Sequence, residues 1–214
     1  LTAVSFARGE TTGGINQLLE QEAGGEFAGW QSFHGVQHVK TGAVWSLTDD
    51  GVLHCTGKPL GYLATRSEFT NFVLTLEWRW PQGEKPGKGG VLLRMTGPDR
   101  IWPKSLEAQI NAGGAGDFWG LAGYHLEGPS DRTKTVEHPD FGTLVHVARL
   151  ADAECPAGQW NRYEIRAEGE SVTLTINGRL VNRATDCEVL PGKILLTAEG
   201  NPIDFRNVSI QPLD

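Results

Sequence analysis

A strict alternation of apolar and polar residues is the feature that most limits how this chain can fold. Between Asn71 and Trp80 every even-numbered residue is apolar, and the residues between them are mostly polar. Successive side chains of a strand point to opposite faces of a sheet, so this pattern predicts a strand with one buried face. The same period recurs at Tyr163–Ala167 and Val172–Ile176. Asn177-Gly178 follows directly and predicts a two-residue hairpin turn.

Similar short runs bring the number of predicted strands to about eleven, separated by frequent turn signals. Many short strands with almost no helix favour an antiparallel β-sandwich or jelly roll over a βαβ fold. We expect one such domain over residues 29–214, after an N-terminal extension, 1–28, with a short helix near Ile15–Leu19. Gly128–Asp140 is expected to be a long surface loop. The further predicted strands are Val44–Thr48, Val52–Cys55, Tyr62–Thr65, Gly90–Met95, Ser105–Asn111, Leu144–Val147, Lys193–Glu199 and Ile203–Ile210.

Charge and hydropathy exclude two classes of partner. The chain has 19 Lys and Arg residues against 26 Asp and Glu residues, a formal net charge of −7. Nucleic-acid binding normally requires a basic surface, so we expect no nucleic-acid partner. No apolar run approaches the roughly 18 residues that a membrane span needs, so we expect none.

The three cysteines form no CxxC motif and no cluster with histidine. Cys155 and Cys187 could form one disulfide in an oxidising compartment, with Cys55 as a small buried residue. The alternative is that all three thiols stay free.

The segment Ser105–Asn111 carries the most informative row of polar residues. Its even-numbered residues are apolar and face the core, so Glu107, Gln109 and Asn111 lie on the opposite face. Such a row is ordinarily a solvated sheet face. A glycine-rich stretch follows directly, and it contains Asp117 and Trp119. Glycine allows a ligand to come close and tryptophan offers an apolar plate for a sugar ring, which favours a binding site.

A second carboxylate, Glu199, lies outside the core by the same parity argument at the end of Lys193–Glu199. Paired carboxylates are the groups that glycoside cleavage uses, one as acid and the other as base or nucleophile. The alternative for Glu199 is an ordinary surface acid before a turn.

Two further polar residues have both a functional and a structural interpretation. Arg94 shares the parity of Gly90 and Leu92, so it either binds a substrate oxygen or forms a structural ion pair. His125 could act as an acid or base or bind a metal, although a lone histidine is more often structural. Among the seven tryptophans we assign a ligand role only to Trp119 and Trp102 and expect the others in the core.

A set of short motifs extends over most of the chain, from Gly29 to Leu213. They are GW at 29–30, WSLTDDGVLHCTG at 45–57, GYLAT at 61–65, FTNFVLTLEWR at 69–79, GVLLR at 90–94, SLEAQI at 105–110, GDFW at 116–119, QWN at 159–161, NG at 177–178 and EGNPIDFRNVSIQPL at 199–213. In this order and spacing, the chain resembles the 3-keto-disaccharide hydrolase domain family, whose fold is a concanavalin A-like jelly roll. The resemblance implies a secreted or periplasmic bacterial protein.

The resemblance also implies that the concave sheet carries a carbohydrate groove, with Glu107, Gln109, Arg94 and Glu199 as the positional equivalents of the family's residues. The implied activity is cleavage of 3-keto-glycosides, either by elimination and hydration or by hydrolysis. In the first route a carboxylate such as Glu107 removes the acidic C2 proton, with electrophilic help from Arg94, His125 or a divalent metal. A non-catalytic carbohydrate-binding module of the same fold is the alternative.

This chain departs from the family at two places. Lys88-Gly89-Gly90 stands where many relatives have Asn-Ser-Gly, and Asn111-Ala112 stands where many have an aspartate. A divalent metal site would therefore need Asp117 or His125 to supply the missing ligand. No cofactor is implied with certainty.

Overall fold

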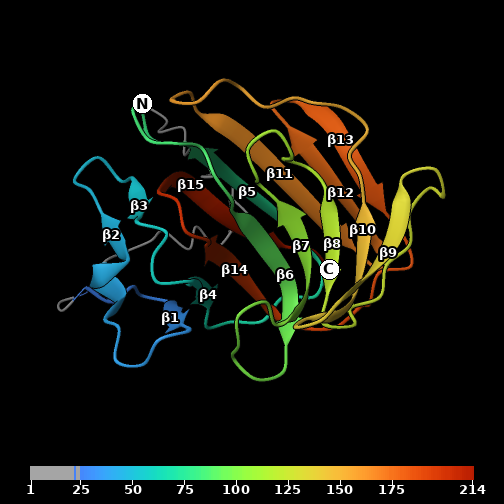
Figure 1. The fold of residues 1–214 in the computed structure, drawn as a ribbon, viewed down its shortest axis with the longest axis horizontal. Helices are drawn as coiled ribbons and strands as arrows, with labels where there is room; N and C mark the ends of the chain where they lie inside the picture. The colour runs from blue at the N-terminus through green and yellow to red at the C-terminus, as the bar shows by residue number, and fades with distance from the viewer. Residues whose placement is uncertain (1–21, 23–24) are drawn as a thin grey trace, which may run out of the picture.

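The structure is a computed structural model that describes residue 22 and residues 25–214. In that part of the chain, two antiparallel sheets pack face to face (Figure 1). The eight-stranded sheet has the order β1-β4-β14-β6-β7-β8-β10-β9, and the seven-stranded sheet has the order β13-β12-β11-β5-β15-β3-β2. The predicted antiparallel β-sandwich is thus confirmed. The predicted N-terminal helix lies outside the described residues.

The bounds of the elements are as follows. The eight-stranded sheet comprises β1 (Trp30–His34), β4 (Gly61–Thr65), β14 (Lys193–Ala198), β6 (Gly90–Thr96), β7 (Lys104–Gln109), β8 (Phe118–Leu121), β10 (Gly142–Val147) and β9 (Thr133–His138). The seven-stranded sheet comprises β13 (Arg179–Ala184), β12 (Ser171–Ile176), β11 (Asn161–Glu168), β5 (Phe72–Arg79), β15 (Ile203–Pro212), β3 (Leu53–Cys55) and β2 (Trp45–Leu47). A short 3-10 helix, η1, spans Thr41–Ala43.

Every predicted strand is present, and the Asn177-Gly178 hairpin turn joins β12 to β13 with positive φ at both residues. The expectation of a long loop over Gly128–Asp140 was wrong in part, because β9 lies inside it. This strand is at the edge of its sheet and pairs only with β10. Five of its six residues are polar, so no alternation marked it in the sequence.

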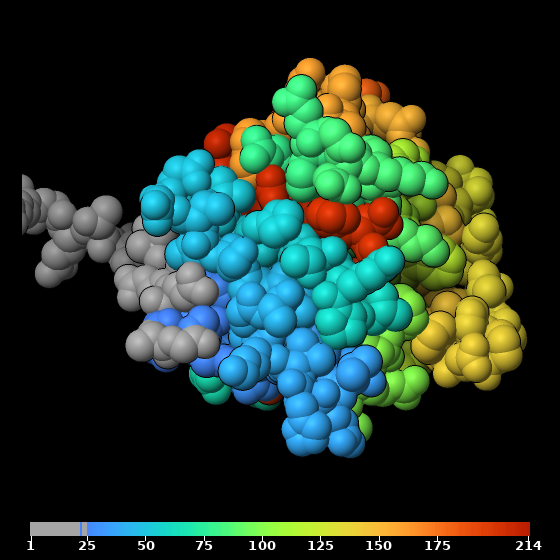
Figure 2. Space-filling model, turned by 60° about the vertical axis from the view of Figure 1, so that its left-hand side comes forward, coloured from blue at the N-terminus to red at the C-terminus, as the bar shows by residue number. Residues whose placement is uncertain are grey.

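The space between the two sheets holds the main hydrophobic core. Trp30, Trp45, Trp78 and Trp80 are all buried in it, as expected, but the expectation was wrong for Trp160, which is half-buried against Arg79 and Arg206. Strand β15 pairs with β3 and β5, which brings the C-terminal residues against the N-terminal part of the described chain. Figure 2 shows these two parts, coloured red and blue to cyan, on the same side of the molecule.

The remaining predictions about the scaffold concern thiols and membranes. All three cysteines are free, so the disulfide considered between Cys155 and Cys187 is not formed. Cys187 is buried, and the Cys155 sulfur instead accepts a hydrogen bond from the Asn177 side-chain amide at 3.4 Å. Within residues 25–214, no helix has the length and apolar character to cross a bilayer.

Candidate functional site

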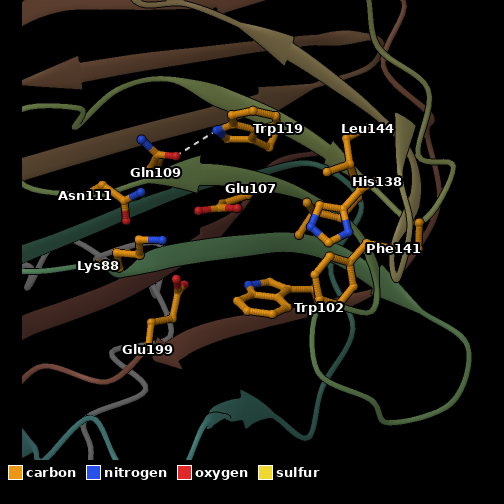
Figure 3. Close-up of a pocket in the computed structure, with 12 residues that line it drawn as sticks. Lys88, Trp102, Glu107, Gln109, Asn111, Trp119, His138, Phe141, Leu144 and Glu199 are labelled. Atoms are coloured by element: carbon orange, nitrogen blue, oxygen red, sulfur yellow. Dashed lines mark hydrogen bonds between the residues drawn. The ribbon is translucent and has the colours of Figure 1, made fainter. Parts of the chain in front are cut away.

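A cavity of about 220 Å³ opens on the face of the eight-stranded sheet that points away from the other sheet. We call it the outer-face pocket. Its floor is Glu107 on β7, and Figure 3 shows the other side chains arranged around that carboxylate. The remaining lining residues are Lys88, Trp102, Gln109, Asn111, Trp119, Leu121, Ala122, His138, Phe141, Leu144 and Glu199.

Strand parity places both carboxylates at this pocket. On β7, Leu106 and Ala108 belong to the main core, so Glu107 lies on the opposite face. On β14, the core residues are Ile194, Leu196 and Ala198. Thr197 and Glu199 are therefore directed to the outer face. The structure thus brings together two acids that are more than ninety residues apart in the sequence.

The Glu107 carboxylate is buried without a hydrogen bond from any described residue. The Glu107 residue is 6% exposed. Burial raises its pKa well above the usual carboxyl value, and the negative charges of Glu199 and Asp117 raise it further, against an opposing effect from Lys88. Charged groups are rarely buried without a partner, so this carboxylate is better explained by a ligand than by folding stability.

Glu199 lies beside Glu107 in the pocket, and within the described part of the chain its carboxylate also lacks a hydrogen-bond partner at one oxygen. Its Oε1 atom is buried and has no hydrogen-bond partner among the described residues. Burial raises the pKa of Glu199, while the Thr197 side chain and the Lys88 charge act in the opposite direction. Figure 3 shows the Lys88 amine directed into the space between the two carboxylates. The pocket therefore holds two acids with raised pKa values beside one cation.

Gly90 makes room for the Glu107 carboxylate. A Cβ atom at Gly90 would lie 2.7 Å from Glu107 Oε1 and 3.0 Å from its Cγ. The Gly90 backbone is fixed by Thr197, whose hydroxyl accepts from the Gly90 N–H at 2.7 Å and donates to its carbonyl at 3.1 Å. The pairing of β14 with β6 thus keeps a space above Gly90 on the sheet surface, and the Glu107 carboxylate occupies that space.

The predicted amide residues Gln109 and Asn111 line the pocket but are engaged with the protein. The indole N–H of Trp119 donates to Gln109 Oε1 at 2.7 Å, and the Gln109 amide donates to the Gly114 carbonyl at 3.1 Å. The Asn111 Oδ1 accepts from the Gly89 N–H at 3.0 Å. These bonds hold the Trp119 ring, which lines the pocket.

Arg94 lies away from the pocket, contrary to the expectation from parity. The pairing of β6 with both neighbours shifts register after Leu93, and Arg94 has a positive φ of 51°. Leu92 and Met95, three residues apart, therefore share the outer face. The buried Arg94 guanidinium instead donates to the carbonyls of Thr70, Gly169 and Glu188 at 2.7–2.9 Å. Its role is structural.

His125 and Asp117 also lie outside the lining of the pocket. His125 is exposed and pairs with Asp186 at 2.8 Å. Asp117 accepts from the His146 ring at 2.9 Å and from the Arg149 N–H at 2.9 Å. His146 in turn packs against Trp119, with ring centroids 4.3 Å apart. Asp117 therefore supports the wall behind Trp119 and does not meet a ligand directly.

The pocket residues do not fit a divalent metal site. Two carboxylates face it, but the third group between them is the Lys88 amine, which repels a cation. Neither Asp117 nor His125 supplies a further ligand. Among the described residues, one group of three potential ligands lies within coordinating distance: His125, Glu127 and Asp186, all exposed and outside the pocket.

Sequence reasoning did not select the basic and aromatic pocket residues Lys88, His138 and Phe141, nor the apolar ones, Leu121, Ala122 and Leu144. Lys88 lies in a loop that the sequence analysis noted only as a departure from the family pattern. His138 and Phe141 flank the turn between β9 and β10. Trp102, the second tryptophan assigned a ligand role, does line the pocket. The available sequence signal for Lys88 was its position: it is a basic residue just before a predicted strand that begins with Gly90 on the groove face.

Comparisons with known proteins identify the family and the fold. The chain matches the 3-keto-alpha-glucoside-1,2-lyase-like domain family over residues 16–211. No curated protein matches it. Among solved structures, a candidate glycosyl hydrolase from Parabacteroides distasonis is similar, with a TM-score of 0.61, 18% identity, and coverage of 89% of this chain and 92% of that chain.

Two further similar structures are a carbohydrate-binding module and an enzyme. A carbohydrate-binding module from Bacillus subtilis has a TM-score of 0.60 and 16% identity, covering 86% of this chain and 95% of that chain. The β-glucanase of Bacillus licheniformis has a TM-score of 0.58 and 12% identity, covering 92% of this chain and 96% of that chain. At these identities the likeness establishes the jelly-roll-like fold. This chain is a member of the 3-keto-alpha-glucoside-1,2-lyase-like domain family.

Proposed function

We propose that the outer-face pocket cleaves 3-keto-glycosides by elimination, with Glu107 as the base. The observation that carries this proposal is the Glu107 carboxylate, buried at the pocket floor, without a hydrogen bond from the described residues and with a raised pKa. A carboxylate of raised pKa is a stronger base than an exposed one. Membership of a lyase-like family supports the same chemistry.

The reaction follows from the acidity that a C3 ketone gives to the C2–H bond. Glu107 takes the C2 proton, and the electron pair of that bond forms an enolate whose charge lies on the C3 oxygen. When the ketone re-forms, a C1–C2 double bond is made and the C1–O bond to the aglycone breaks. The departing oxygen takes a proton from water. The hydroxide left by that water adds to C1, and Glu107 returns its proton to C2, which completes a net hydrolysis that consumes one water.

Lys88 and Glu199 are positioned to stabilise the enolate. Both lie at the same end of the pocket beside Glu107. An ammonium group attracts the developing oxyanion, and a carboxyl group that stays protonated can donate a hydrogen bond to it. Because the negative charge of Glu199 is one of the causes that raise the pKa of Glu107, a proton held by Glu199 favours the ionised form of Glu107 that acts as the base. Lys88 therefore takes the electrophilic role that sequence reasoning gave to Arg94, His125 or a metal.

The test is an assay with the 3-keto form of a glucoside and with its unoxidised parent. We expect the wild-type protein to cleave only the oxidised substrate, and Glu107→Gln to reduce kcat by about 10²–10⁴-fold, the usual range for a general base. Glu77→Gln, on the other sheet, is the matched control. Cleavage of the unoxidised parent would instead support direct hydrolysis by the two carboxylates.

A carbohydrate-binding module is the competing function, because a module from Bacillus subtilis has a similar fold. In that case the wild-type protein would bind glycosides without consuming either substrate, and Glu107→Gln would alter affinity alone. Calorimetric titration beside the kinetic assay separates these results.

A further inference from the structure

The outer-face pocket has two chemically different ends, because its strands are antiparallel. The segments that precede β6 and follow β7 and β14 meet at one end, and they supply Lys88, Asn111 and Glu199. The β6–β7 loop and the β9–β10 turn meet at the other end, and they supply Trp102, His138 and Phe141. Glu107 lies between the two ends, as Figure 3 shows. A ligand that spans the pocket must therefore be polar at one end and apolar at the other.

The apolar end is built from three rings, of which the Phe141 ring contacts the other two. The Trp102 and Phe141 rings meet edge to face with centroids 4.7 Å apart, and the Phe141 and His138 rings stack at 4.4 Å. Trp102 holds a positive φ of 51°, a backbone conformation that costs a bulky residue about 1–2 kcal/mol. Such conformations concentrate at ligand sites, where the surrounding structure enforces them. We call these three residues the aromatic end.

His138 gives the aromatic end a hydrogen-bond donor. Its Nδ1 atom accepts from the Asp140 N–H at 3.1 Å, so in the neutral ring the proton is on Nε2. His138 lines the pocket, and Figure 3 shows its ring beside Trp102 and Phe141. A bound group with one oxygen acceptor on a planar apolar body would satisfy this donor and cover the rings.

We propose that the aromatic end is an aglycone subsite that selects glycosides of phenols. This inference rests on the proposed function, since the sugar ring then occupies the charged end beside Glu107. A phenyl ring packs favourably against Trp102 and Phe141, whereas a sugar aglycone would bury several hydroxyl groups there against a single donor. A phenol, with a pKa near 10, also leaves from C1 with less help from an acid than an aliphatic alcohol needs.

The first test compares kcat/KM for the 3-keto forms of phenyl glucoside and of a glucosyl-glucose disaccharide. We expect the wild-type protein to prefer the phenyl substrate by about tenfold or more. Phe141→Ala should lower kcat/KM several-fold more for the phenyl substrate than for the disaccharide, and keep only the preference that the better leaving group gives. Equal values for the two wild-type substrates, or an equal loss on both in the variant, would overturn the subsite.

The matched control is Trp160→Ala. Trp160 is another half-buried tryptophan, but it packs between the Arg79 and Arg206 guanidinium groups, 4.5 and 4.1 Å from its ring, outside the pocket. We expect this variant to keep the wild-type preference between the two substrates. A preference lost in both Trp160→Ala and Phe141→Ala would point to general loosening of the fold and would contradict the subsite.

A binding measurement separates failure of this inference from failure of the proposed function. Unoxidised phenyl and methyl glucosides are titrated calorimetrically into the wild-type protein and Phe141→Ala. Tighter binding of the phenyl compound, lost in Phe141→Ala, would support the subsite even if neither 3-keto substrate were consumed. Equal affinity for the two glucosides, or no binding of either, would reject it.

Discussion

Carboxylates on the outward faces of the two sheets have opposite environments. On the seven-stranded sheet, Arg206 donates to Glu77 at 2.7 Å and Arg79 donates to Asp204 at 2.9 Å. On the eight-stranded sheet, neither Glu107 nor Glu199 forms an ion pair with any described residue. The pKa of Glu77 is accordingly lowered, because hydrogen bonds and positive charges outweigh the effect of its burial, whereas that of Glu107 is raised.

This difference distinguishes charged groups that stabilise the fold from charged groups that have another role, such as binding a ligand. A buried group without a partner costs folding free energy, and a sequence selected only for stability would replace it. The unpaired acids are gathered at a cavity, while the paired ones lie on an outward face without such a cavity. Substitutions on the two sides should therefore change stability in opposite directions.

The largest effect is expected at Arg94, a buried charge whose hydrogen bonds all go to backbone carbonyls. Arg94→Ala removes three hydrogen bonds and leaves the carbonyls of Thr70, Gly169 and Glu188 without their donor. We expect a loss of about 3–5 kcal/mol in the free energy of unfolding, measured by urea denaturation. Arg183→Ala, at an exposed arginine, is the control and should change it by less than about 0.5 kcal/mol. A near-neutral Arg94→Ala with a raised KM would contradict the structural role.

Arg94 also shows where sequence reasoning fails at this site. Parity placed Glu107 and Glu199 correctly on the pocket side because β7 and β14 are regular up to those positions. One irregularity in β6 reverses the parity of every residue after it. Arg94 has a left-handed backbone without being glycine, so nothing in the sequence marked the irregularity.

The aromatic end was missed for a different reason. His138 and Phe141 lie at the ends of β9 and β10, and their place depends on the strand order β7-β8-β10-β9. A single sequence gives the periodicity of each strand but not the order in which distant strands pair. The fold class could thus be predicted from local pattern, whereas the part of the site built from edge loops could not.

A substitution at Glu107 should increase stability while it removes activity. We expect Glu107→Gln to raise the free energy of unfolding by about 1–3 kcal/mol at pH 7, because it replaces a buried ionisable group without a partner by a neutral amide of similar size. The raised pKa means that the folded protein holds this proton more tightly than the unfolded chain. The penalty therefore begins as pH rises above the usual carboxyl value of 4.5 and is absent well below it.

Urea denaturation of the wild-type protein and Glu107→Gln between pH 4 and 8 measures this difference. The advantage of the variant should grow with pH. An advantage that is constant, or that grows toward acid pH, would mean that the carboxylate has a partner in solution.

Gly90→Ala examines the same carboxylate without changing its charge. The added Cβ would lie 2.7 Å from Glu107 Oε1, so the carboxylate must move to a new position. Because small displacements of a reacting group slow catalysis, we expect kcat to fall roughly tenfold. Gly42→Ala is the control, since its Cβ would meet the nearest atom at 3.7 Å. An unchanged kcat in Gly90→Ala would show that the position of Glu107 does not matter for the reaction.

The smallest effect is expected at Glu77, on the paired side of the comparison. Glu77→Gln removes the ion pair with Arg206 and should lower the free energy of unfolding by about 0.2–1 kcal/mol without changing activity. The lowered pKa of Glu77 means that this stabilisation is present above the usual carboxyl pKa and is lost as pH falls through the folded value. The stability difference between the wild type and Glu77→Gln should therefore disappear at acid pH, as should the difference between the wild type and Glu107→Gln. At neutral pH the two differences should have opposite signs. If both variants shifted stability in the same direction at pH 7, the division between paired and unpaired acids would have no energetic meaning.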